Sequence, residues 1–148
     1  MTASPPLRGY KPARVPGVKC PMNIELQTNT EDPTLEFLNI EKYDDRSGFG
    51  ATINVASNGF SAKVFCTFGE WPMDEFISQL ESCNNSLSGQ ATLKPEWDNW
   101  FITFTVKNNG QVEVNGMLYS ADQELKYEFI TDQTCLSPLI KDLKEWQR

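Results

Sequence analysis

The sequence predicts an α+β fold in which about seven or eight antiparallel strands and two helices follow the order four strands, helix, four strands, helix. Several segments alternate apolar and polar residues, as half-buried strands do. Two other segments repeat apolar residues every three or four positions, which is typical of amphipathic helices. The sequences Ser57–Gly59 and Lys107–Gln111 contain Asn-Gly and therefore predict β-hairpin turns between strands.

Alternation places four strands in each half of the chain. The second strand, at about residues 34–43, has two alternative registers, because two overlapping apolar pairs fit it. The expected inward positions of the first four strands are Ile24 and Leu26; Leu35 and Phe37, or Leu38 and Ile40; Ala51, Ile53 and Val55; and Phe60, Ala62, Val64, Cys66 and Phe68. Those of the last four are Ala91 and Leu93; Trp100, Ile102, Phe104 and Val106; Val112, Val114, Gly116 and Leu118; and Leu125, Tyr127 and Phe129.

Each half ends in a segment with helical periodicity. The two apolar stripes are Met73, Phe76, Ile77, Leu80 and Cys83, and then Leu136, Leu139, Ile140 and Leu143. Pro72 suits the first turn of the first helix, and Gly89 is expected to supply the left-handed residue after it. Asp132 and Thr134 are expected to cap the start of the second helix, with Ser137–Pro138 as an alternative start.

Residues 1–21 differ in composition from the rest of the chain. They hold five prolines and four basic residues but no acidic residue, which predicts a flexible Pro-rich leader before a single domain at residues 22–148. A docking tail, or a translation start at Met22, are the alternatives. Because the whole chain carries −7 and the leader +4, residues 22–148 carry −11. Such a charge repels nucleic acid and favours basic partners, although it also suits solubility alone.

The motifs of common enzymes and metal proteins are missing from the sequence. The chain has no histidine, no CxxC pair, no glycine-rich phosphate loop and no GxSxG elbow, so we expect no enzyme activity, no cofactor and no metal. The four cysteines are expected to be free thiols, and Cys135 is expected to be a buried residue at a helix start rather than a nucleophile. An acid–base pair of Glu96 and Asp98 is the weak alternative. Without a signal sequence or a long apolar run, the predicted location is the cytoplasm, with no membrane contact.

Two acidic stretches are the predicted partner-binding residues. Asp44 and Asp45 lie in a turn-rich loop, and Trp97 and Asp98 lie in the sequence KPEWDNW, near the start of a strand. An exposed tryptophan among acids is a reasonable anchor for a protein partner. The alternative for Trp97 is packing beneath a helix or the leader.

The segments 73–89, 90–118 and 125–143 resemble a family of bacterial immunity proteins found beside contact-dependent and wall-associated polymorphic toxins, the WapI-type immunity proteins. The resemblance covers about residues 50–145. It is carried by Leu87 and Gly89, Ala91 and Leu93, Phe104, the run Gly110–Gly116, and Asp132–Thr134. These are turn, strand and cap positions, so the resemblance implies a fold and a family but assigns no interface residue. The element order is also similar to the Whirly architecture of some single-stranded-DNA binders.

The resemblance implies an immunity protein that binds and neutralises a cognate bacterial toxin domain, a cationic nuclease, in the cytoplasm. It would act by protein–protein contact, with no chemistry of its own. The alternative is a single-stranded nucleic-acid-binding module that stacks bases on Trp97 and Trp100. The −11 charge of residues 22–148 makes nucleic acid the less favoured partner.

Overall fold

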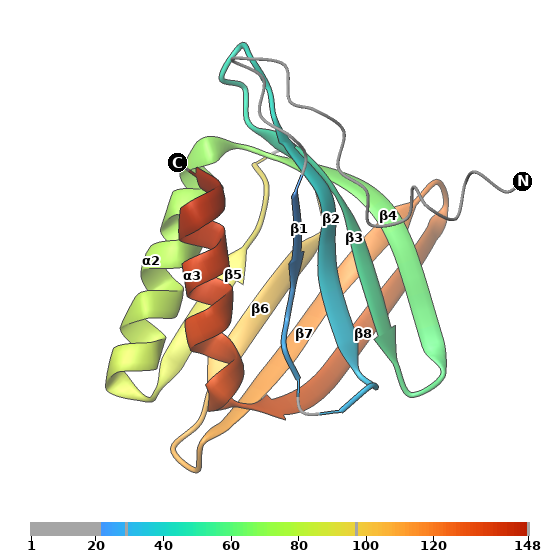
Figure 1. Ribbon diagram of the computed structural model, residues 1–148. Helices are drawn as coiled ribbons and strands as arrows, with labels where there is room; N and C mark the ends of the chain where they lie inside the picture. Colours follow the sequence, from blue (N-terminus) through green and yellow to red (C-terminus); the bar gives the residue numbers. More distant parts are fainter. Residues whose placement is uncertain (1–21, 29, 97, 148) are drawn as a thin grey trace, which may run out of the picture.

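The computed structural model describes residues 22–147 except Asn29 and Trp97, so the predicted leader at residues 1–21 lies outside it (Figure 1). The elements are β1 (Met22–Glu25), β2 (Thr34–Lys42), β3 (Phe49–Ser57), β4 (Phe60–Phe68), α2 (Glu70–Ser86), β5 (Gly89–Leu93), β6 (Phe101–Val106), β7 (Gln111–Ser120), β8 (Gln123–Asp132), the short 3-10 helix η1 (Gln133–Cys135) and α3 (Leu136–Gln147).

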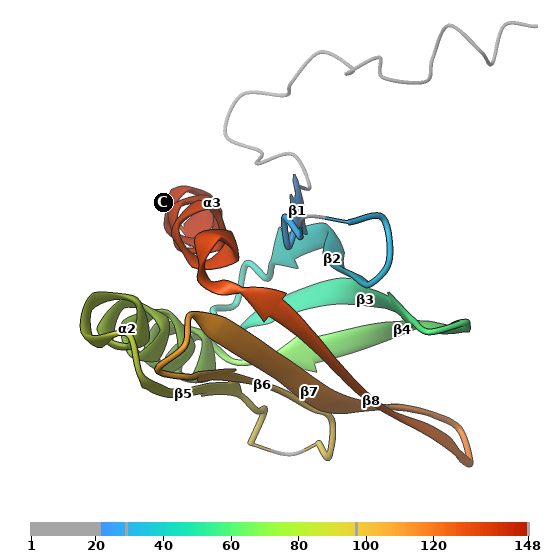
Figure 2. The ribbon, with the colours of Figure 1, turned by 90° about the horizontal axis from the view of Figure 1, so that it is seen from below.

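The strands form two antiparallel four-stranded sheets with the orders β1-β2-β3-β4 and β5-β6-β7-β8. We call them the N-terminal and C-terminal sheets. Figure 2 shows them as two layers, with α2 and α3 side by side along one side of the layers. The predicted α+β architecture, with a helix after each set of four strands, is confirmed.

The core lies between the two sheets and under the two helices. The apolar stripes of both helices are buried, as are nearly all the alternating apolar residues of the strands. Aromatic pairs connect the layers: Phe49 with Trp146 at 4.4 Å between ring centroids, Phe68 with Trp100 at 5.8 Å, and Phe76 with Phe104 at 5.8 Å. Burial of this apolar surface is the main force that stabilises the fold.

An irregularity within β2 explains why the sequence of this strand fits two registers. Leu35, Phe37 and Ile40 are buried, but Leu38 is only half-buried, so each alternative is correct for one part of the strand. The pairing with β3 is interrupted between Leu38 and Glu41, and Asn39 has a left-handed φ of 53°. This bulge adds one residue and switches the side of the sheet that later residues face.

Strand β4 has the predicted alternation, but only one end of its inner face is buried. Cys66 and Phe68 are core residues, whereas Ala62 and Val64 are half-buried and Phe60 is 70% exposed. The expectation that Phe60 faces the core is therefore wrong. Phe60 follows the hairpin turn, at the end of the strand where nothing in the described structure covers it.

The helix termini differ in part from the sequence-based expectation. Leu87, not Gly89, adopts the left-handed conformation that ends α2, with φ of 60° and its N–H donating to the carbonyl of Cys83. The Asp132 cap is confirmed, because its carboxylate accepts from the Thr134 N–H at 2.9 Å. No helix in the described part of the chain has the length and hydropathy of a membrane span.

Candidate partner-binding site

Two loops that are far apart in sequence meet at one end of the molecule. The β2–β3 loop and the loop that joins β5 to β6 lie on either side of the junction between β4 and α2. Between them is a hollow of about 310 Å³, lined by Tyr43, Ser47, Phe49, Thr67, Phe68, Gly69, Pro95, Glu96 and Asp98. The loops that carry the two acidic stretches therefore border one surface, which we call the acidic end.

The β2–β3 loop holds its two aspartates in a tight, exposed turn. The N–H of Tyr43 donates to the carbonyl of Gly48, which closes the loop at 2.9 Å. Gly48 has φ of 139°, and a Cβ there would lie 2.2 Å from the carbonyl oxygen of Phe68, so only glycine lets the loop approach β4 this closely.

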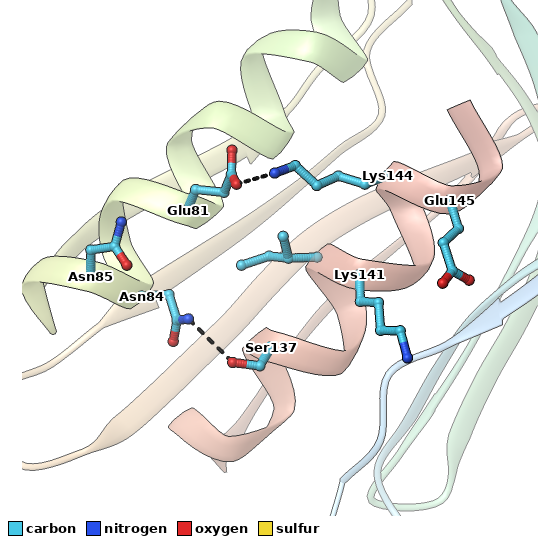
Figure 3. Close-up of a pocket in the computed structure, with 8 residues that line it drawn as sticks. Glu81, Asn84, Asn85, Ser137, Lys141, Lys144 and Glu145 are labelled. Atoms are coloured by element: carbon cyan, nitrogen blue, oxygen red, sulfur yellow. Dashed lines mark hydrogen bonds and ion pairs between the residues drawn. The ribbon is translucent and has the colours of Figure 1, made fainter. Parts of the chain in front are cut away.

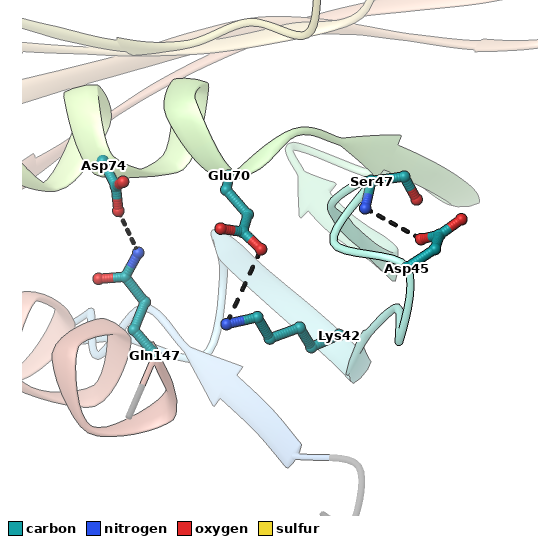
Figure 4. Close-up of polar contacts among 6 residues, drawn as sticks. All are labelled: Lys42, Asp45, Ser47, Glu70, Asp74 and Gln147. Carbon is teal, nitrogen blue, oxygen red and sulfur yellow. Dashed lines mark hydrogen bonds and ion pairs between the residues drawn. The ribbon is translucent and has the colours of Figure 1, made fainter.

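Asp45 is stabilised in its charged form within this loop. Its carboxylate accepts a hydrogen bond from the Ser47 N–H at 2.9 Å (Figure 4). Hydrogen bonds from Ser47 hold the pKa of Asp45 below its usual range, because they favour the carboxylate. Asp44 beside it is also exposed, so the loop presents two carboxylates to solvent.

The β5–β6 loop is fastened to β4 by a buried tryptophan. The Trp100 indole N–H donates to the carbonyl of Thr67 at 3.3 Å, and its ring packs edge-on against Phe68. Asp98 precedes this anchor and is exposed, with its carboxylate accepting the Asn99 N–H at 2.8 Å. The expected placing of Trp100 in the core is confirmed, while Trp97 lies outside the described residues.

The first turn of α2 adds an exposed aromatic residue to the same end. Trp71 is 66% exposed, and it follows Glu70, whose carboxylate lies 3.8 Å from the Lys42 ammonium (Figure 4). Asp74 accepts a hydrogen bond from the Gln147 side chain of α3 at 2.6 Å. These contacts fix the start of α2 against β2 and α3, so Trp71 is presented by a rigid element.

Trp71 was not singled out in the sequence analysis, although the helical pattern contains the information. The buried stripe of α2 includes Met73, Phe76 and Leu80, and a residue two positions before Met73 points to the opposite side of a helix. An aromatic residue at that position is expected to face solvent. Asp44, Asp45 and Asp98 are exposed as partner-binding residues must be, and their role stays a prediction.

The thiols of the described residues are unsuited to nucleophilic chemistry. Cys66, Cys83 and Cys135 are buried, and burial raises the pKa of Cys66 and of Cys135 to about 12. The charge of Asp98 adds to the shift at Cys66, and that of Asp132 adds to the shift at Cys135. A thiol with a raised pKa holds little thiolate at neutral pH. Residues 22–147, without the two gaps, contain no cluster of three metal-ligating side chains.

A second hollow lies between the two helices, and its polar residues make contacts that hold the helices together. Asn84 of α2 donates to the Ser137 hydroxyl of α3 at 3.3 Å, and Lys144 pairs with Glu81 (Figure 3). Lys141 and Glu145 also line this hollow, so charges of both signs border it. Its polar contacts join α2 to α3.

Comparison with solved structures found two distant likenesses. The MRP1/MRP2 crystal structures of Trypanosoma brucei align with a TM-score of 0.49 and 10% identity, covering 97% of this chain and 91% of theirs. The CdiA-CT/CdiI toxin and immunity complex from Enterobacter cloacae aligns with a TM-score of 0.44 and 9% identity, covering 84% of this chain and 99% of that one. No curated protein sequence matches the chain significantly.

The family comparison is more specific than these structural likenesses. It matches residues 25–146, from the last residue of β1 to the last turn of α3. The match therefore includes strands β2 to β8, all of α2, nearly all of α3 and the two loops of the acidic end. Together with the resemblance carried by its turn and cap residues, this match means that the chain belongs to the Immunity protein WapI-like family.

Proposed function

We propose that this protein is an immunity protein that binds a cognate bacterial toxin domain in the cytoplasm and neutralises it by contact. Membership of the WapI-like family is the observation that carries the proposal. The protein needs no catalytic group for this role, because it acts by covering the toxin surface.

We further propose that the acidic end makes the contact and that the toxin surface is basic. Glu96 and Asp98 line the hollow, and Asp44 and Asp45 lie in the loop whose residues Tyr43 and Ser47 line it. All four acidic residues are exposed. A nuclease is the favoured toxin, because an enzyme that binds phosphates presents a basic surface to which an acidic protein is complementary. Trp71 would be the apolar anchor at the centre of the contact.

The first experiment is co-expression of the chain with the polypeptide encoded immediately upstream of it. We expect toxicity from the upstream polypeptide alone, growth when both are expressed, and a stable one-to-one complex on purification. Growth arrest despite co-expression, with no complex, would contradict immunity towards that polypeptide. In that case, quenching of tryptophan fluorescence by oligonucleotides at low salt would test the nucleic-acid alternative.

The acidic end is tested by a triple variant, Asp44→Asn, Asp45→Asn and Asp98→Asn. Asparagine keeps the side-chain oxygen that accepts the local hydrogen bonds, so the change removes charge but not loop structure. We expect the association rate with the toxin to fall by about tenfold at low salt, as steering by charge predicts. The matched control, Asp122→Asn with Glu124→Gln and Glu128→Gln, removes three charges from β8 and its hairpin. An equal loss of rate in both triple variants would contradict a specific role for the acidic end.

A further inference from the structure

Among the strands that the structure describes, β4 pairs with β3 alone, so the N-terminal sheet has a free edge at β4. Of the other three edge strands, β1 and β5 are covered in part by helices. Strand β1 packs beside α3, and the Gln79 side chain of α2 accepts the N–H of Thr92 in β5 at 2.9 Å. β4 and β8 are the edges without such a helix among the described elements.

The hairpin turn decides which groups of β4 point outward. Asn58 and Gly59 form a two-residue turn with φ of 54° and 88°, so Ser57 and Phe60 are a hydrogen-bonded pair. Hydrogen-bonded pairs alternate along an antiparallel ladder, so Ser61, Lys63 and Phe65 turn their N–H and C=O groups away from β3. The bond from the Trp100 indole to the carbonyl of Thr67 agrees with this alternation and closes the edge at that end.

The two free edges differ in their protection against pairing. On β8 the corresponding outward residues include Glu124, Lys126 and Glu128, and charged residues on an edge discourage another strand. Lys63 is the one charged residue in β4, which has no proline, and its register with β3 is unbroken from end to end. Phe65 is 61% exposed on this strand.

The open edge leads directly to the acidic end. A Cβ on Gly50 would lie 2.4 Å from the Tyr43 hydroxyl and 2.8 Å from the Phe65 ring, so both rings lie over this glycine on the outer face of the sheet. Tyr43 and Thr67 also line the hollow of the acidic end. The edge from Ser61 to Phe65, the two rings and the hollow thus form one continuous surface.

Resting on the proposed immunity function, we propose that β4 is a docking edge to which an extended segment of the toxin adds as a fifth strand. A row of alternating N–H and C=O groups is complementary to an extended backbone. The segment would run along Ser61, Lys63 and Phe65 towards the acidic end, where basic residues of the toxin meet Asp98 and Glu96. A second copy of this chain is a poor occupant, because each copy carries a net charge of −7 and the two copies repel each other.

Proline substitution separates backbone pairing from side-chain contact. Lys63→Pro removes the outward N–H, and proline is tolerated on an edge strand where the N–H faces solvent. Lys63→Ala is the control, because it loses the same charge but keeps the N–H. We expect Lys63→Pro to bind the co-expressed toxin at least about tenfold more weakly than Lys63→Ala, as loss of pairing at one edge position predicts. Lys126→Pro and Lys126→Ala, at an outward position of β8, are expected to bind alike.

Amide hydrogen exchange in the unaltered complex gives an answer that does not depend on how well the proline variant folds. We expect the amides of Lys63 and Phe65 to exchange at least about tenfold more slowly in the complex than in the free protein. Unchanged exchange at both amides, or equal toxin binding by Lys63→Pro and Lys63→Ala, would overturn strand addition. If the unaltered protein binds no toxin, the proposed function itself fails, and this is a separate outcome.

Discussion

Gly50 and Gly116 show how a missing side chain makes room for an aromatic ring. Neither residue has a positive φ, so the reason for glycine is space and not backbone conformation. At Gly116, on the inner face of the C-terminal sheet, a Cβ would lie 2.4 Å from both the carbonyl oxygen of Phe101 and the Tyr127 hydroxyl. At Gly50 the two rings are at the surface and can move, whereas at Gly116 one obstacle is backbone.

The substitution Gly116→Ala is therefore expected to lower the free energy of unfolding by about 2 kcal/mol, as overpacking of a core does. Urea denaturation followed by tryptophan fluorescence measures this change. Asn115→Ala, at the neighbouring half-buried position on the outer face, is the control and should change stability by less than about 0.5 kcal/mol. Equal effects at the two positions would contradict the close packing around Gly116.

The buried thiols predict a loss of stability at high pH. Burial raises the pKa of Cys66 and Cys135 from about 9 to about 12, so the neutral thiol is favoured in the folded protein. Each group then stabilises the fold fully below pH 9, and this contribution is lost as the pH rises towards 12. The free energy of unfolding is expected to fall by up to about 1.4 kcal/mol per pH unit for each thiol in this range.

Urea denaturation at pH 7, 9 and 10.5 measures this fall in stability. The double variant Cys66→Ala, Cys135→Ala is the control, because it removes both thiols and should lose less stability between pH 9 and 10.5. The same decline in variant and unaltered protein would show that other groups cause it.

At the scale of elements, η1 and α3 depend on the cap at Asp132. The carboxylate accepts hydrogen bonds from the backbone N–H and the hydroxyl of Thr134, just before the helix whose apolar stripe covers the core. We expect Asp132→Ala to lower the free energy of unfolding by about 1 kcal/mol, the usual effect of losing such a cap. Glu145→Ala removes the same charge from an exposed position of α3 and should have little effect on denaturation. A loss of similar size in both variants would contradict the cap.

At the scale of the whole molecule, removing the basic residues 1–21 is expected to change the net charge without changing the stability of the fold. The buried apolar residues of the described part of the chain lie between Ile24 and Trp146, and four basic residues lie in residues 1–21. A variant that starts at Met22 should therefore unfold at the same temperature as the full chain. Its charge of −11 instead of −7 should make association with a basic toxin faster at low salt. Calorimetry and stopped-flow mixing measure the two quantities, and a lower melting temperature would contradict the predicted boundary at residue 22.

Most of the secondary structure could be predicted from local sequence patterns. Apolar residues alternate in β6 and β7 and form stripes in α2 and α3, and these patterns identify the elements. The reason is that residues on the buried side of a strand recur every two positions and those of a helix every three or four. The bulge at Asn39 and the exposure of Phe60 could not be predicted from these periodic patterns. The first changes the alternation within a strand, and the second depends on how far one sheet extends beyond the other.

The sequence by itself determined the order of the elements, the hairpin turns, the Asp132 cap, the lack of catalytic motifs and the acidic charge of residues 22–148. It also pointed to Asp44, Asp45 and Asp98 as separate candidates. Only the tertiary structure decided that their loops meet at one hollow, that Trp71 faces solvent at the start of α2, and that β4 leaves an open edge among the described strands. The reason is physical: periodicity reports which side of an element is buried, whereas the meeting of two loops depends on how the sheets and helices pack.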